Sequence, residues 1–231
     1  MTQPAKVFAT VLKPSPAIVA AHGLILVWAG YLGWTSPVEM RGVYVVLLLF
    51  QSFSAATGFV FRARRGHFDQ VLAAPASRIH VAFAHAAVSI APGIASWLLV
   101  SVIEGVSNRG TVPLGLTLPA MSALLYMSAV AWALALPFAR YSSGVVWLMV
   151  AIGLAGAGRL LALRQAYVAA LEPGGDIWRA TGAALVFPPL MVTEPAPAAI
   201  SALVVLAAAL AVIGIGVLAV ESFDFPLVDP S

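Results

Sequence analysis

The chain is dominated by six long apolar runs, each close to the roughly 20 residues that an α-helix needs to cross a bilayer. Only 9% of its 231 residues are charged, whereas soluble domains carry about 25%. The runs are continuous rather than alternating, which favours helices over the strands of a barrel. We therefore predict an all-α polytopic membrane protein with a single domain. The predicted spans are Ala17–Trp34, Val43–Phe61, Val81–Ile103, Val112–Phe138, Val145–Leu163 and Ala198–Val220.

Basic residues give this arrangement a direction. Six spans place both chain ends on the same side, and Lys and Arg accumulate on the cytoplasmic side of membrane proteins. The side with the two ends carries more basic residues than the other side. We therefore predict that both termini, and the loop between the second and third spans, are cytoplasmic in a cell (plasma or inner) membrane. The residues on that side are Lys6, Lys13, Arg62, Arg64, Arg65, Arg78 and Arg140.

Composition also excludes several kinds of chemistry. The formal charge of +3 is too small to indicate a nucleic-acid partner. The chain has no cysteine, which excludes disulfides, thiolate catalysis and cysteine-based metal sites. It has no G-x-x-x-x-G-K-[ST] loop, so we do not expect the chain itself to bind ATP in the Walker manner. We expect no catalytic, cofactor-binding or metal site, and no enzymatic activity.

Two shorter segments are predicted to associate with the membrane without crossing it. Ala5–Lys13 places its apolar residues on one helical face between lysines, which suits an N-terminal interfacial helix; a disordered tail is the alternative. Thr181–Val192 is apolar but only about half a span long, and Pro188-Pro189 interrupt it. We expect it to be re-entrant or interfacial before the last span. A full crossing would instead move the C-terminus to the other side.

The loop between the second and third spans, Arg62–Arg78, reads RARRGHFDQVLAAPASR. Its glycine can end the preceding helix, and the next residues can form a short helix with Phe68 and Leu72 on one face. Pro75 ends that helix, and Ser77 can cap the following span. The result is a short cytoplasmic helix whose apolar face can dock a soluble partner. The alternative is a positively charged loop that only fixes topology.

This loop resembles the cytoplasmic loop of type-2 ABC exporter permeases. The pattern is G-x-F-x-x-x-L-x-x-P-x-S-R after the second span, and the plan of interfacial helix, six spans and re-entrant hairpin is also similar. In that family the loop holds a coupling helix that inserts into a cleft of the ATPase subunit. Members often carry acidic residues before the glycine, where this chain has arginines. The positions that the resemblance assigns to ATPase coupling are Arg65, Gly66, Phe68, Leu72, Pro75, Ser77 and Arg78.

The resemblance implies a function for the whole chain. The chain would be the membrane subunit of an ATP-driven ABC transporter, an exporter in this family. Two copies, or this chain with a homologous permease, would enclose a translocation path through the lipid bilayer. Separate ATPase subunits would bind ATP and Mg²⁺ and act through the coupling helix. No motif in the chain indicates the substrate.

Three ionisable side chains lie within predicted spans and are candidates for the translocation path: His22, His85 and Arg159. A charge inside the apolar zone is costly and is often functional. The alternatives are a neutral histidine bonded to a neighbouring helix, and an arginine that reaches the headgroups from the outer end of the fifth span. His80 and His85 are five residues apart, so they do not share a helix face as two metal ligands would.

Residues near the span ends are explained by the membrane itself. Glu104 ends the third span, where it is either a solvated charge or a marker of the outer mouth of a path. Tyr31, Trp34 and Tyr44 gather near the predicted outer boundary, where aromatic side chains anchor helices.

Prolines and glycines inside the spans indicate kinks and close packing. Pro92-Gly93 in the third span and Pro119 in the fourth predict kinks. Glycines let helices approach closely, either within one subunit or across a dimer. Those of the fifth and sixth spans are Gly153, Gly156, Gly158, Gly214 and Gly216.

Two other functions suit a chain of this kind. A transporter or channel that works without ATP would need paired ionisable residues deep in the spans, and no intramembrane carboxylate is evident. An intramembrane enzyme would need a nucleophile with a base at membrane depth. His85 and Ser89 are i, i+4 neighbours, but no orienting acid accompanies them.

Overall fold

The computed structural model describes residues 16–36, 40–64, 78–108, 112–136, 160–195 and 199–222, and these ranges are helical apart from short connections. They contain five long helices and four short ones, and no strand. The long helices are α2 (Pro16–Thr35), α3 (Met40–Arg64), α5 (Arg78–Ser107), α6 (Leu118–Ala135) and α11 (Ala199–Ser222). The short ones are η2 (Leu114–Leu116), α8 (Leu160–Leu171), α9 (Ile177–Val186) and α10 (Leu190–Thr193).

All five long helices are long and apolar enough to span a membrane. They coincide with the first, second, third, fourth and sixth predicted spans, so the prediction of an all-helical, multi-pass membrane protein is confirmed for the described part of the chain. Only the last four residues of the predicted fifth span, Val145–Leu163, are described, as the first turn of α8. The interfacial segment Ala5–Lys13 lies outside the described residues.

The start of the fourth span was predicted wrongly. Val112 and Pro113 are extended, the next three residues form the 3₁₀ helix η2, and α6 begins only at Leu118. A proline fixes its own backbone and disfavours a helical residue before it, so this apolar stretch does not continue as a helix. Pro119 therefore lies in the first turn of α6, where a proline is tolerated, and the kink expected there does not occur.

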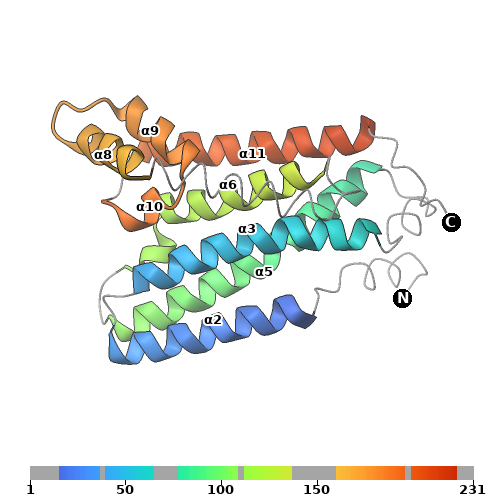
Figure 1. The fold of residues 1–231 in the computed structure, drawn as a ribbon, viewed down its shortest axis with the longest axis horizontal. Coiled ribbons are helices and arrows are strands. Elements are labelled where there is room, and N and C mark those ends of the chain that lie inside the picture. Colours follow the sequence, from blue (N-terminus) through green and yellow to red (C-terminus); the bar gives the residue numbers. More distant parts are fainter. Residues whose placement is uncertain are drawn as a thin grey trace.

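The long helices lie side by side along the long axis of the molecule (Figure 1). At one end, here called the terminal end, α2 begins, α3 ends, α5 begins and α11 ends. At the other, the hairpin end, lie the end of α2, the start of α3, the end of α5, η2 and the three short helices α8, α9 and α10 (Figure 1).

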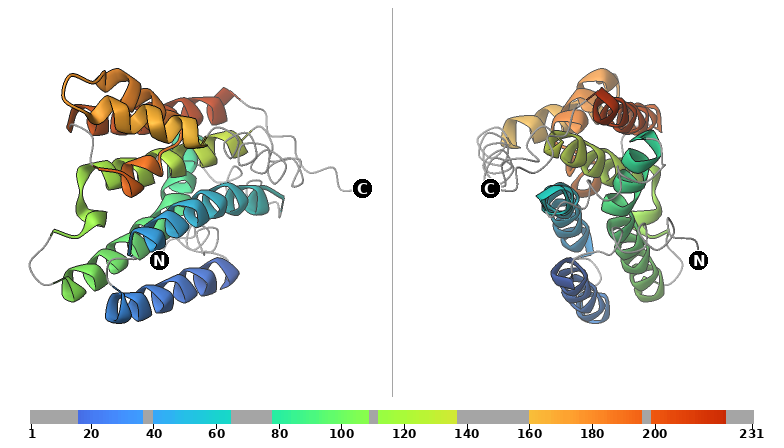
Figure 2. Two further views of the ribbon diagram at one scale, coloured as in Figure 1. Left: turned by 60° about the vertical axis from the view of Figure 1, so that its left-hand side comes forward. Right: turned by 90° about the vertical axis from the view of Figure 1, so that its right-hand side faces the viewer.

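Helix α6 occupies the centre of the bundle and α2 its edge (Figure 2). α6 packs most extensively against α11 and α3, and also contacts α5 and α10. Small residues on α6, such as Ala120, Ala123 and Ala129, are fully buried and let these neighbours approach closely. α2 packs mainly against α5 and α3 and leaves large apolar side chains exposed, as does α11. Such apolar outer faces are what a lipid environment requires.

The glycines of the sixth span do not behave alike. A Cβ at Gly216 would lie 2.5 Å from the ring of Trp132 and 3.4 Å from Leu136, both on α6, so this glycine makes the closest approach of α11 to α6 possible. A Cβ at Gly214 would meet no atom within 4 Å. The packing role predicted for both is therefore confirmed for Gly216 alone. The fifth-span glycines lie outside the described residues.

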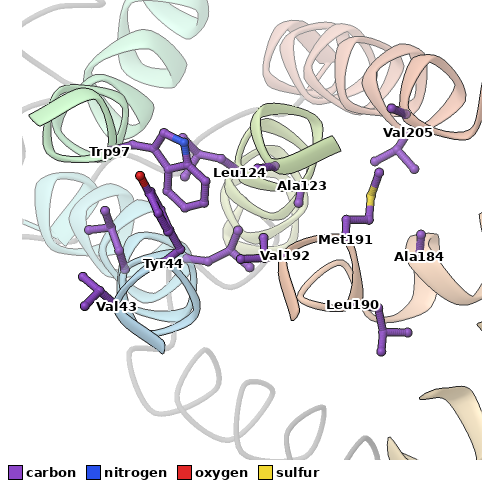
Figure 3. Packing of buried hydrophobic residues seen from close by; sticks show 14 of the residues in the cluster. Val43, Tyr44, Trp97, Ala123, Leu124, Ala184, Leu190, Met191, Val192 and Val205 are labelled. Carbon is purple, nitrogen blue, oxygen red and sulfur yellow. The ribbon is translucent and has the colours of Figure 1, made fainter. Parts of the chain in front are cut away.

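The buried core spreads across α2, α3, α5, α6, α8, α9, α10 and α11, and Figure 3 shows part of it. Its largest side chains include Trp97 and Tyr44, whose rings are 4.7 Å apart. α10 is a single turn, yet Leu190, Met191 and Val192 are all buried, and the turn packs on α3, α6 and α9. The short helices at the hairpin end are therefore part of the folded core.

The segment before the last long helix is a helical hairpin followed by a break. Gly174, with a φ of 85°, turns the chain between α8 and α9, and the Asp176 carboxylate caps α9 by accepting from the Trp178 amide at 2.9 Å. α9 ends before Phe187, and α10 begins after Pro189. The predicted interruption of Thr181–Val192 at its two prolines is thus confirmed.

Candidate functional site

The coupling positions predicted from the sequence flank a gap in the described chain. Residues 65–77 lie outside it, so the structure does not describe Arg65, Gly66, Phe68, Leu72, Pro75 or Ser77. Arg78 is the first residue of α5. α3 ends at Arg64, and both helix ends lie at the terminal end of the bundle (Figure 1).

Of the three residues predicted for a translocation path, two are described and both are buried. His22 on α2 is 5% exposed, its Nδ1 lies 2.8 Å from the Ile18 carbonyl of the same helix, and its ring packs edge-on against Phe50. His85 on α5 is 1% exposed. Neither lines the two clefts described below, which adjoin Glu104 and Arg164. Arg159 lies outside the described part of the chain.

The pair that would suit an intramembrane nucleophile is not activated in this structure. Ser89 is buried one turn after His85 on α5, but its hydroxyl makes no hydrogen bond within the described part of the chain. A nucleophilic serine needs a hydrogen-bonded base. The described geometry therefore gives no support to that chemistry.

A buried polar contact joins α3 to α5 where the latter carries its proline. Pro92 has no N–H to give to the helix, and the Gln51 amide of α3 donates to two carbonyls in the turn before it, Ser89 at 2.9 Å and Ile90 at 3.3 Å. The Gln51 carbonyl in turn accepts from Ser54 at 3.0 Å. Neighbouring side chains commonly satisfy backbone groups next to a proline in membrane helices.

Gly93 provides the room for this contact. A Cβ at position 93 would lie 2.1 Å from Cδ and 2.3 Å from Cγ of Gln51. Any larger residue would have to displace the amide from its two carbonyl partners. The Pro92-Gly93 pair therefore marks a specific attachment between α3 and α5.

A second polar cluster, the Glu104 cluster, lies at the hairpin end. Glu104 is only 8% exposed, and its Oε2 accepts from the Tyr44 hydroxyl at 2.7 Å and from the Leu114 amide at 2.8 Å. The Tyr44 hydroxyl also lies 3.2 Å from Ser101 Oγ. Both partners of this carboxylate oxygen are hydrogen-bond donors.

The cluster corrects two predictions. Glu104 is not a solvated charge at a helix end, because η2 folds over it and supplies a backbone donor. Tyr44 is not an anchor at the membrane surface, because it is fully buried against Trp97. Tyr31 and Trp34 on α2 are 66% and 89% exposed, as surface anchors would be.

Glycine at position 115 lets η2 sit on the cluster. A Cβ there would lie 2.2 Å from Ser101 Oγ and 2.6 Å from the Tyr44 ring. The Trp97 indole donates to the Gly115 carbonyl at 2.8 Å, so η2 is held by α5 from two sides. The connection between α5 and α6 is thus attached to the bundle by two side chains of α5, Trp97 and Glu104.

Beside the cluster opens a cleft of about 570 Å³, here called the Glu104 cleft. It contains an acid and a base: Glu104 and Arg41 both line it, yet they do not form an ion pair. One guanidinium nitrogen of Arg41 donates to the Thr193 carbonyl of α10 at 3.2 Å. The described lining is Met40, Arg41, Glu104, Asn108, Val112, Leu114 and Thr117.

An ion pair joins α8 to the residue that follows α10, at the start of the connection to α11. Arg164 Nε lies 2.5 Å from Glu194 Oε1. A smaller cleft of about 350 Å³ adjoins Arg164 and includes Gln165 and Glu172 in its lining. Tyr167 is buried on the same helix, and burial, reinforced by the nearby Glu194 carboxylate, raises the pKa of its phenol.

Sequence reasoning missed Gln51 and the partners of Glu104. For the former, the usable signal is a single amide side chain within a long, mainly apolar run. The latter has no local signal, because Tyr44 and Leu114 approach Glu104 only through the fold. Comparisons of the chain with protein-family models, with curated proteins and with solved structures find no match.

Proposed function

We propose that the chain is the membrane-spanning subunit of an ATP-driven ABC transporter, an exporter, coupled to separate ATPase subunits through the loop between α3 and α5. The observation that carries this proposal is the placement of the two helix ends that flank the loop. α3 ends and α5 begins at the terminal end, where α2 begins and α11 ends (Figure 1). A coupling motif there would face the same side as both ends of the described chain.

The same placement supports six spans. α6 runs toward the terminal end, whereas α8, α9 and α10 gather at the hairpin end, so the chain between α6 and α8 joins opposite ends of the bundle (Figure 1). The proposed span Val145–Leu163 supplies this crossing. With six crossings, the excess of basic residues puts both termini in the cytoplasm and the α8–α9 hairpin on the outer side, where it re-enters the membrane surface.

In the proposed cycle α3 and α5 move as one rigid unit. ATP binding closes the ATPase subunits, which push on the coupling helix between these two helices. Gln51 binds the α5 carbonyls before Pro92, so α3 and α5 move together. A second copy or a homologous permease completes the path. The chain contributes a two-state element that ATP binding biases, and no covalent chemistry.

Copurification of an ATPase tests the proposal. Tagged protein is crosslinked in membranes, extracted in mild detergent and analysed for a bound Walker-A ATPase, beside the variant Phe68→Ala/Leu72→Ala. The matched control is Phe83→Ala/Leu98→Ala, which removes the same two residue types from exposed positions on α5. We expect wild type and control to retain the ATPase and the loop variant to lose it. Wild type without an ATPase would refute the proposal and favour transport without ATP.

The orientation is tested separately with single cysteines, for which the cysteine-free chain gives no background. Ser77→Cys and Glu172→Cys are labelled in intact cells with a membrane-impermeant maleimide. We expect labelling at position 172 and none at position 77 until the cells are opened. The reverse pattern would place the loop outside, where no ATPase could reach it.

A further inference from the structure

Two side chains of opposite charge line the Glu104 cleft without pairing with each other. Glu104 and Arg41 both line it, and no ion pair forms between them. Glu104 uses Oε2 for its two donors, so Oε1 has no partner within the described part of the chain. Arg41 gives one described bond to Thr193 and has further N–H groups to offer. A cleft of about 570 Å³ between a carboxylate and a guanidinium suits a ligand with both charges.

The position of the cleft indicates where such a ligand would come from. It lies at the hairpin end, beyond the last turn of α5 and the first turn of α3, where a membrane helix passes into the headgroup layer. Trp34 and Trp178 are exposed at the same end, as is usual for aromatic residues at headgroup level. The most abundant molecules with paired charges at this level are zwitterionic phospholipids.

The chemistry of the two side chains favours one type of headgroup over the others. A guanidinium binds phosphate with paired hydrogen bonds. A carboxylate oxygen gains a charge-assisted hydrogen bond from a primary ammonium, which has three N–H donors, and none from a quaternary ammonium, which has no N–H. Among zwitterionic headgroups, phosphoethanolamine therefore fits better than phosphocholine.

We propose that the Glu104 cleft binds a phosphoethanolamine group, with its ammonium on Glu104 and its phosphate on Arg41. The site would exist whether or not an ATPase drives the chain. Its source is either the headgroup of a membrane phospholipid or a soluble phosphoethanolamine compound. In both cases the ligand ties α3 to the end of α5.

Binding is measured with purified full-length protein in two arms. In detergent, glycerophosphoethanolamine and glycerophosphocholine are titrated while the thermal unfolding midpoint is followed. In bilayer discs of phosphatidylcholine, native mass spectrometry counts phosphatidylethanolamine retained by the protein. We expect ethanolamine compounds to bind at least tenfold more tightly than choline compounds, which corresponds to about 1.4 kcal/mol. A rise in the unfolding midpoint in the first arm would show that the free headgroup is sufficient for binding. Retention in the second arm without such a rise would show that the whole lipid is needed. Either result supports the site.

Two variants identify the residues. Glu104→Gln keeps a carbonyl oxygen for Tyr44 and Leu114 but removes the charge, and Arg41→Gln changes an exposed side chain. Each should weaken binding about tenfold. The matched control, Glu172→Gln, removes an exposed carboxylate at the smaller cleft and should change nothing. Choline compounds binding as well as ethanolamine compounds, or unchanged binding in Arg41→Gln, would overturn the proposal even if Glu104→Gln fails to fold.

Discussion

The contact between Gly93 and Gln51 predicts that two substitutions will interact. Gly93→Ala adds a methyl group where Cδ of Gln51 would be only 2.1 Å away. The amide can move aside only by giving up its bonds to Ser89 and Ile90. We expect Gly93→Ala to destabilise the protein when Gln51 is present, and to have the opposite effect when Gln51→Ala has removed the colliding atoms.

The magnitudes follow from the atoms involved. Overpacking a well-packed core costs about 1–3 kcal/mol. In the Gln51→Ala background the collision is absent, and replacing a helical glycine by alanine stabilises by about 1 kcal/mol. The two substitutions should therefore couple by roughly 2–4 kcal/mol. Gln51→Ala alone loses the two bonds to α5 and that from Ser54, at about 0.6 kcal/mol each in a membrane, or about 2 kcal/mol together.

The assay is reversible unfolding in mixed micelles by increasing SDS, followed by circular dichroism, for the wild type, the two single variants and the double variant. Gly214→Ala is the matched control, since a Cβ there meets no atom within 4 Å. It should be neutral or slightly stabilising. If the double variant loses as much as the two singles combined, Gly93 and Gln51 are not in contact and the described attachment of α3 to α5 is wrong.

Two further predictions use the same unfolding measurement. Gly216→Ala should destabilise by about 1–3 kcal/mol because its methyl group would collide with Trp132, and an effect as small as that of Gly214→Ala would refute the packing of α11 on α6. Tyr167→Phe should be neutral or mildly stabilising at pH 7, because the buried hydroxyl has no hydrogen-bond partner within the described part of the chain. Folding raises the pKa of Tyr167, so the stability that its neutral phenol contributes is present below the unfolded pKa of about 10 and is lost as the pH rises above that value. Tyr167→Phe should therefore reduce the loss of stability at alkaline pH. An unchanged dependence of stability on alkaline pH would contradict the burial of Tyr167.

The apolar runs predicted the five described spans because burial in lipid requires little beyond length and low charge. They could not predict where α6 begins, because residues such as Val112 and Leu114 are apolar whether the chain is helical or extended. Pro113 and Gly115 carried the contrary signal. Apolarity outweighed them in the prediction, whereas in the structure the backbone requirements of proline and glycine decided the conformation.

The candidate site shows a different limit. Glu104 was expected at the end of the third span, where a carboxylate can reach water, and it does lie in the last turn of α5. Its burial depends on Tyr44, sixty positions earlier, and on the turn that follows α5. Such contacts between distant segments leave no periodicity in the sequence. The coupling positions in the loop after α3 rest on a motif alone and stay predictions.

The central position of α6 has a consequence for how the protein is made. α6 packs most extensively against α11, which comes much later in the chain. Translation proceeds at about 5–20 residues per second, so α6 waits for seconds in the membrane before its main neighbour leaves the ribosome. During that time the face that will receive Gly216, including Trp132, is uncovered. The helix that is innermost in the finished bundle is thus accessible during synthesis to insertases that protect it and to membrane proteases that remove incomplete chains.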